Sequence, residues 1–298
     1  MNNIKKIGLT ALAGSLVALG SAQAGEMSVS GSINTTLKFG APHADTAAAS
    51  ANNTSRSLGA DRDVTFTGSG ELDNGTTFSM STTVDDNYGM SGSTTTITTP
   101  SMGTFQLGAS NGSASYLYDE EVPQAYEQVS DSKQTAANKV GDFMDNNYVL
   151  YTTPTFEIAG ASITGHVGYS PQASDGKVGD GGTVVYNETY GSGKEAGVTI
   201  TYDALKLGFY GAERQNLTPV AAGSDAVADE FNGAWYAKYT MGPVSIGYSE
   251  AYLDAGLAAA IDNTTTAQAE RTSGGIYEDE QMSLAFNVND NMSISYTT

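Results

Sequence analysis

The sequence predicts an all-β protein built as an antiparallel, up-and-down transmembrane β-barrel. Apolar and polar residues alternate in many short runs, and these runs are joined alternately by tight turns and by long polar loops. In a meander every second connection lies at the same end of the sheet. The alternation therefore places short turns at one end and long loops at the other, as in membrane barrels. The tight turns are expected at residues 73–75, 100–103, 203–204, 241–243 and 289–291.

The first 24 residues have the pattern of a secretory signal. Lys5 and Lys6 supply a positive start, residues 7–19 form an apolar core too short to span a bilayer, and Ala22-Gln23-Ala24 is a small-x-small cleavage pattern. The mature chain is therefore expected to begin at Gly25. We assign residues 1–24 to the signal and residues 25–298 to the barrel domain.

About thirteen strands can be counted by alternation, each near the ~10 residues that a tilted span needs. In the first run, residues 26–39, Val29, Ile33 and Leu37 share one face while serine, threonine and asparagine occupy the other. Two later runs are separated by Asp73-Asn74-Gly75, and Asn-Gly tolerates the positive φ that hairpin turns require.

A soluble β-sandwich or β-solenoid would also alternate. The outer face of a soluble protein is usually rich in lysine and glutamate, whereas the polar set here is mostly Ser, Thr, Asn and Gly. Tyrosine and phenylalanine also gather near the ends of the runs, where an aromatic girdle would meet lipid headgroups. Both observations favour the barrel.

Composition excludes several other classes of protein. Without the two signal lysines, 11 of the 13 basic residues remain against 33 acidic ones, a net charge of −22, so no basic face exists to bind nucleic acid. The chain has no cysteine, so closure of the hydrogen-bonded sheet has to replace disulfides. After the signal, no apolar run reaches the roughly 18 residues of a membrane helix.

The loop from Ser110 to Asn146, after the fifth strand, is longer than most structureless loops. Its centre places apolar anchors, Tyr116 to Tyr118, directly before the acidic triplet Asp119 to Glu121. A segment that stayed fully solvated would not need these apolar anchors. We therefore expect the loop to fold into the barrel and to line a constriction with carboxylates, opposite basic side chains on the wall.

The chain resembles Gram-negative general-diffusion porins, of the sixteen-stranded trimeric type found in alphaproteobacteria. The resemblance rests on the signal end, the first strand, the run Val64-Thr65-Phe66-Thr67-Gly68-Ser69-Gly70 with its hairpin, the long loop, and the return Tyr148 to Pro154. It implies a homotrimer in the cell outer membrane, with acidic loop residues facing wall lysines and arginines across an eyelet. By position, the acidic side is Asp119, Glu120, Glu121 and Glu127, and the basic side is Lys38, Arg56, Arg62 and Lys238.

Two points of this assignment depend on details of the strands. Lys38 and Lys238 have the parity of the polar face, whereas Arg62 shares the parity of Val64 and Phe66 and faces inward only if a bulge intervenes or the strand begins later. The resemblance also implies a final strand ending in phenylalanine, but the sequence stops at Thr298. We therefore expect about three further strands, which makes the sequence a C-terminally truncated form.

No catalytic motif stands out, so we expect no enzyme activity and no cofactor. Gly191-Ser192-Gly193-Lys194 lacks the spacing of a phosphate loop, and the two histidines, His43 and His166, have no metal-ligand spacing. Three acid pairs could hold Ca²⁺ but lack the EF-hand spacing, and we expect them to be solvated loop carboxylates. These pairs are Asp85-Asp86, Asp229-Glu230 and Asp279-Glu280.

The function expected from these features is a water-filled channel for passive diffusion of small hydrophilic solutes and ions, with a preference for cations. Two alternatives stay open. A solute-specific outer-membrane channel would share the barrel but line it with a binding track, and an exported β-rich adhesin would be soluble after release.

Overall fold

The computed structural model describes residues 25–39, 56–85, 89–109, 113–118, 121–125, 144, 147–173, 190–217, 228–254, 256 and 276–298. The chain divides into two compact units with a boundary between Thr95 and Thr96. We describe each unit by itself.

The first unit contains an antiparallel ladder of three strands, and the next strand, β4, crosses the boundary. These strands are β1 (Glu26–Phe39), β2 (Arg56–Glu71), β3 (Thr77–Val84) and β4 (Met90–Thr99). The β1–β2 pairing is regular over its whole length, from Glu26 opposite Ser69 to Phe39 opposite Arg56.

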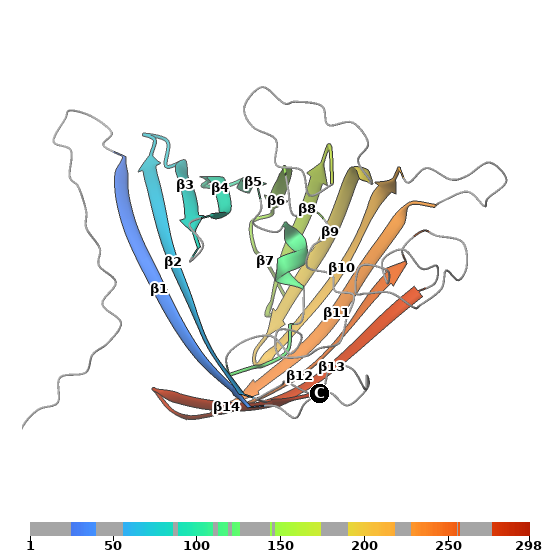
Figure 1. The fold of residues 1–298 in the computed structure, drawn as a ribbon. Helices are drawn as coiled ribbons and strands as arrows, with labels where there is room; N and C mark the ends of the chain where they lie inside the picture. The colour runs from blue at the N-terminus through green and yellow to red at the C-terminus, as the bar shows by residue number, and fades with distance from the viewer. Residues whose placement is uncertain are drawn as a thin grey trace, which may run out of the picture. The chain divides into compact units, whose positions relative to one another are not determined.

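In its described residues, the second unit contains the remaining strands and one short 3-10 helix, η2. They are β5 (Gly103–Ala109), η2 (Ala114–Leu117), β6 (Tyr148–Thr152), β7 (Phe156–Ile158), β8 (Ala161–Ser170), β9 (Tyr190–Tyr202), β10 (Leu205–Asn216), β11 (Glu230–Met241), β12 (Val244–Asp254), β13 (Ile276–Asn289) and β14 (Met292–Thr297). In Figure 1, β8 to β13 run side by side as long neighbouring strands.

The predicted fold class is confirmed, because successive strands pair with their neighbours in chain order and the pairings are antiparallel. The described residues form fourteen strands, since the three-residue β7, which pairs with β8 beside the main order, adds one to the thirteen expected. The tight turns lie where the sequence predicts them. Within the described residues, no helix is long and apolar enough to cross a membrane. The expected further strands beyond Thr298 stay a prediction.

The two faces of β8 to β13 differ in polarity, and it is the polar one that is buried. Buried side chains on this polar face include His166, Ser170, Glu195, Arg214, Glu230, Asn232, Tyr236, Ser249, Gln281 and Ser283. The opposite, apolar face is exposed and carries Val167, Tyr169, Phe209, Phe231, Tyr239, Ile246, Met282, Leu284 and Phe286. Phe209 is 46% exposed while Glu195 is 3% exposed. A sheet that leaves its large apolar side chains outside suits a hydrocarbon solvent.

The apolar face ends in a diagonal row of charged residues. Counted from the tight turns, the first charged residues of this face on β9 and β10 are Lys194 and Glu213, which are cross-strand partners. On β12 and β13 they are Glu250 and Glu280, also partners, and they lie four residues nearer the tight turns than the row that continues from Glu213. Four residues cover ~13 Å and three strand spacings ~14 Å, so the row slopes by about 43°.

This slope matches the tilt of strands in membrane barrels, about 35–45°. On β10 and β13 the apolar band has the same length, because Glu213 lies eight residues after Leu205 and Val288 lies eight residues after Glu280. Eight residues cover ~26 Å along the strand and ~20 Å along the barrel axis, close to the height of an apolar membrane band. The charged row therefore marks one edge of the membrane.

Aromatic donors surround the acid at this edge. The Glu250 carboxylate accepts a hydrogen bond from the indole N–H of Trp235 at 2.9 Å and from the hydroxyls of Tyr248 and Tyr252. Membrane proteins place Trp and Tyr at the level of the lipid headgroups, where the apolar part of the ring contacts hydrocarbon and its N–H or O–H contacts polar groups.

We expect an arginine in the middle of the apolar face to be much more costly than one on the polar face. Val198→Arg should lower the free energy of unfolding by about 2–4 kcal/mol, since Val198 lies midway along the apolar band. Thr201→Arg on the same strand but the opposite face is the matched control, with an expected loss of ~1 kcal/mol or less. Urea unfolding in lipid vesicles measures both, and equal losses would contradict the assignment of the two faces.

Candidate functional site

Residues of the long loop lie on the polar face of the second unit, and we call residues 113–118 and 121–125 the inner loop. Two glycines in the strands make room for it. A Cβ on Gly197 of β9 would lie 2.5 Å from the Tyr118 ring, and a Cβ on Gly247 of β12 would lie 2.3 Å from Pro123. Glycine inside a strand often marks a place where another part of the chain approaches closely, and both glycines do so here.

The buried carboxylate of Glu195 anchors the start of the inner loop. It accepts hydrogen bonds from the Ser113 hydroxyl at 2.8 Å, from the Ala114 backbone N–H at 2.9 Å, and from the Tyr210 hydroxyl at 2.8 Å. Two of these donors belong to the loop and the third to β10. Three donors converge on one carboxyl group, so this single side chain ties the loop to the sheet.

Tyr118 is the aromatic anchor of the inner loop and is 1% exposed. Its ring stacks on Tyr210 with centroids 5.3 Å apart, and its hydroxyl lies 2.8 Å from Nδ1 of His166. Burial raises the pKa of Tyr118 to about 12, so the hydroxyl keeps its proton at neutral pH. It can then donate to Nδ1 of His166, which gives this polar-face histidine a structural partner.

The second part of the inner loop extends over β11 to β14. Glu121 forms an ion pair with Lys238 of β11, the Ser283 hydroxyl of β13 donates to the Pro123 carbonyl, and the Ala125 N–H donates to the Ser295 hydroxyl at 2.9 Å. The inner loop thus contacts strands from β8 to β14 and crosses most of the polar face of the second unit.

Two wall lysines flank an aromatic ring beside this crossing. Lys206 and Lys238 are cross-strand partners on β10 and β11, and their ammonium groups lie 5.5 Å and 5.3 Å from the centroid of the Tyr236 ring. Glu121 neutralises one of them. The result is a loop carboxylate facing a short basic strip on the wall.

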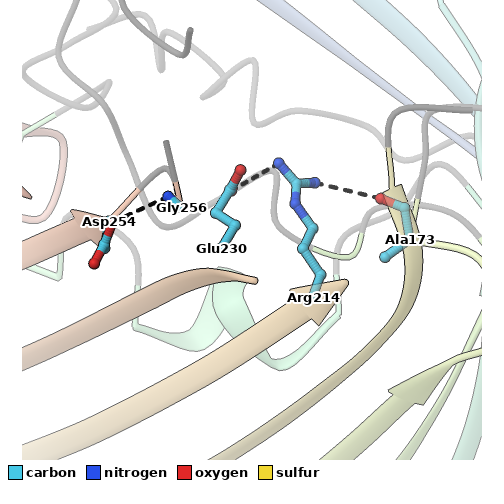
Figure 2. A network of polar contacts seen from close by, with 5 residues as sticks. All are labelled: Ala173, Arg214, Glu230, Asp254 and Gly256. Atoms are coloured by element: carbon cyan, nitrogen blue, oxygen red, sulfur yellow. Dashed lines mark hydrogen bonds and ion pairs between the residues drawn. The ribbon is translucent and has the colours of Figure 1, made fainter. Parts of the chain in front are cut away.

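A second polar network lies near the loop ends of β10 and β11 (Figure 2). The Arg214 guanidinium donates to Glu230 at 2.8 Å and to the Ala173 carbonyl at 3.3 Å, and it stacks over the Tyr190 ring at 3.5 Å. Nearby, the Gly256 N–H donates to Asp254 at 3.0 Å. Arg214 and Glu230 are both 4% exposed, so their charges satisfy each other and do not face open water.

Among the acidic and basic residues that the sequence analysis assigns to the constriction, the structure brings Glu121 and Lys238 together. Asp119, Glu120 and Glu127 lie outside the described residues. Lys38 and Arg56 belong to β1 and β2, opposite Ser57 and Phe39 respectively, and their side chains lie outside the described part of the structure.

Arg62 lies opposite Ile33 in a β1–β2 pairing whose register shows no bulge. Its side chain is exposed and shares the face of Val64 and Phe66. The condition under which Arg62 would turn to the polar face is therefore not met.

The acid pairs match the predicted solvated loop carboxylates only in part, since Asp229 is exposed outside the strands but Glu230 is not. Glu230 is buried at the start of β11 and is paired with Arg214. Asp279 and Glu280 belong to β13, where alternation sends them to opposite faces. Asp85 accepts a hydrogen bond from the Gly89 N–H at 2.9 Å, and Asp86 lies outside the described residues. In the described ranges, no group of three or more potential metal ligands occurs.

Sequence reasoning missed Glu195 and Tyr210, which hold the inner loop. Glu195 reads as the residue that breaks a phosphate-loop motif, and Tyr210 as one member of an alternating strand. The available signal is the glycines on the polar face. A Cβ on Gly168 would lie 2.1 Å from Glu195, and one on Gly208 would lie 2.2 Å from Tyr236. Both glycines thus mark places where a large side chain lies across the polar face of the sheet.

The sequence matches the family model described as Gram-negative porin over residues 8–292. No curated protein matches the chain. Similar solved structures include a loop deletion mutant of OmpT, an outer membrane protein of Vibrio cholerae, at 11% identity and a TM-score of 0.45, with 93% of each chain covered. Two mutants of the Rh. blastica porin are 12% and 13% identical with TM-scores of 0.41 and 0.42, covering 91% of this chain and 93% of theirs.

Removal of the Glu195 carboxylate should release the start of the inner loop while leaving the barrel strands paired. In Glu195→Ala, the Ser113 hydroxyl and the Ala114 N–H lose their acceptor, so the amide of Ala114 should exchange with solvent faster by roughly tenfold or more. Hydrogen exchange followed by mass spectrometry measures this rate. Glu278→Ala on the outward side of β13 is the control, and unchanged exchange at Ala114 in both variants would contradict the anchoring role.

Proposed function

The chain belongs to the Gram-negative porin family and lies in the outer membrane, and on that premise we propose that it forms a water-filled channel for passive diffusion of small hydrophilic solutes and ions. The observation that carries this proposal is the inner loop on the polar face. A loop that crosses the polar face of the sheet narrows the aqueous path along that face. The path stays polar because the side chains of this face are polar. No covalent chemistry is needed for such transport.

The proposed constriction has an acidic and a basic side. The ion pair between Glu121 and Lys238 supports it, together with Lys206 beside Lys238 on the wall. We include the neighbouring loop acids Asp119, Glu120 and Glu127 on the acidic side by their sequence position, and Lys38 and Arg56 on the basic side by the family resemblance. Arg62 is left out because its face is that of Val64.

We propose a preference for cations. The mature chain carries 33 acidic against 11 basic residues, once the two signal lysines are removed from the 13 of the full sequence. Carboxylates within about 10 Å of the path, the Debye length at 0.1 M salt, raise the local concentration of cations.

We also propose a homotrimer. The family resemblance supports it, and cross-linking in native membranes would test it.

The central test is conductance. The full chain reconstituted in planar bilayers should open discrete, ion-conducting steps whose size grows linearly with KCl concentration. A purified chain that inserts into the bilayer and conducts no current would refute the channel. Conductance that saturates with one solute would instead favour a solute-specific channel.

Charge changes at the constriction should shift the reversal potential in a KCl gradient in opposite directions. A unit charge at ~10 Å in water changes an ion's energy by ~0.4 kcal/mol. A reversal changes the charge by two units and acts on cations and anions in opposite directions, ~1.7 kcal/mol in total, so the ratio of cation to anion permeability should change by roughly 15-fold. Lys238→Glu should raise this ratio and Glu121→Lys should lower it.

Glu278→Lys is the matched control for this experiment, because Glu278 lies on the outward side of β13. Its reversal potential should equal that of the wild type. A shift in the control as large as that in Glu121→Lys would mean that the overall charge, and not the constriction, sets the selectivity.

A further inference from the structure

A row of hydrogen-bond donors crosses the polar face of the second unit towards the tight turns, and we call it the donor row. Its members are consecutive cross-strand partners. From β8 to β13 they are Ser162, Thr201, Lys206, Lys238, Gly247 and Ser283. Apart from the glycine, each member carries a hydroxyl or an ammonium group. A solute that moves along this face therefore meets a strip of donors.

The inner loop occupies one end of the donor row. Glu121 forms its ion pair with Lys238. Pro123 lies over Gly247, and its carbonyl accepts a hydrogen bond from Ser283. Both ligands that the loop supplies are oxygen atoms, and one of them belongs to a carboxylate. The loop thus shows which kind of ligand the donor row binds.

The other end of the donor row also binds an acid, because the Ser162 hydroxyl donates to the Glu157 carboxylate at 2.6 Å. Between the two ends lie Thr201, which is exposed, and Lys206, which is half-buried. Among the residues that the structure describes, neither of these two side chains has a hydrogen-bond acceptor. The middle of the row is therefore available to an oxygen ligand that comes from outside the chain.

This middle part lies on the tight-turn side of the inner loop. On β9 the loop contacts Gly197, and on β10 it contacts Tyr210. Thr201 and Lys206 lie four residues nearer the tight turn on the same two strands. Four residues cover ~13 Å along a strand. A solute that enters from the tight-turn side therefore reaches Thr201 and Lys206 before it meets the loop.

The buried ring of Tyr236 fixes the positive charges of the donor row. The ammonium groups of Lys206 and Lys238 lie 5.5 Å and 5.3 Å from its centroid, and a tyrosine ring attracts cations in this range. Glu121 neutralises Lys238. Lys206 is thus the lysine of the row whose charge can act on a solute, and the ring limits its freedom before any solute arrives.

We propose that Thr201 and Lys206 bind the carboxylate of a permeating organic acid on the tight-turn side of the inner loop. The Lys206 ammonium and the Thr201 hydroxyl donate to the carboxylate oxygens, as Lys238 donates to Glu121 in the same row. This site rests on the proposed channel function and gives a path of acidic overall charge one place where organic anions stop. Two partly exposed donors bind weakly, so the anion also leaves, as conduction requires.

Block of the current by citrate tests the site. Single channels of the full chain are held in a planar bilayer in KCl, and potassium citrate is added to each side in turn. Each bound citrate should interrupt the current briefly. The interruptions should be more frequent from one side than from the other, because citrate from the tight-turn side reaches Lys206 without passing the inner loop.

Substitutions in the donor row should change how long citrate stays bound. Lys206→Gln should shorten its residence time by roughly fivefold, since a partly exposed ion pair contributes up to ~1 kcal/mol. Thr201→Val should shorten it less, and Lys206→Arg should keep most of it because charge and donors remain. Residence time is the readout, because a change of overall charge acts mainly on how often the anion arrives.

Lys194→Gln is the matched control, since it removes the same charge from the outward face of β9 and should leave the residence time unchanged. Heat-modifiable migration on gels verifies that each variant is folded. Equal residence times in the wild type and in folded Lys206→Gln would overturn the site. A channel that conducts KCl without interruption by citrate would also overturn the site while the channel function stands, whereas a chain without any conductance would refute both.

Discussion

The structure depends on one constraint, which is that the outward face of the sheet meets hydrocarbon. In such a solvent every backbone polar group has to be paired within the protein, and the antiparallel ladder from strand to strand does this. The same constraint sends the apolar side chains outward and leaves the polar ones for the inner side. Burial is therefore reversed relative to a soluble protein, as the exposed Phe209 and the buried Glu195 illustrate.

The inner loop follows from this reversal. A polar wall can hold a loop by directed hydrogen bonds and ion pairs. Glu195 contributes two such contacts, and His166, Lys238 and Ser283 contribute one each. Apolar packing adds to them, because Ala114 and Tyr118 belong to a cluster of buried residues that includes Tyr210 and Tyr236. The wall glycines matter because they allow the loop backbone and its rings to approach a sheet that already carries large tyrosines.

Much of the fold could be predicted from the sequence because period-two alternation and turn chemistry are local signals. The turns at Asp73 to Gly75 and at Asp203-Ala204 are examples, and both lie as expected. The short strand β7 was missed because its turn, at Ala159-Gly160 with positive φ at both residues, has no strong dipeptide signal. The contacts of the loop could not be predicted in detail, because Glu195 and Tyr210 meet it only through the pairing of distant strands. The local sequence also gives no sign that Glu230 is buried by Arg214, which lies 16 residues away.

The long sequence separation of the loop contacts has a consequence for assembly. Ser113 binds a carboxylate 82 residues later in the chain, and Ala125 binds a hydroxyl 170 residues later. The surface that receives Tyr118 does not exist until β8, β9, β10 and β11 have paired, since each supplies part of it. The loop is thus synthesised before the strands that bind it and can dock on the sheet only after they have paired. A docked loop therefore indicates that most of the sheet has formed in the correct register.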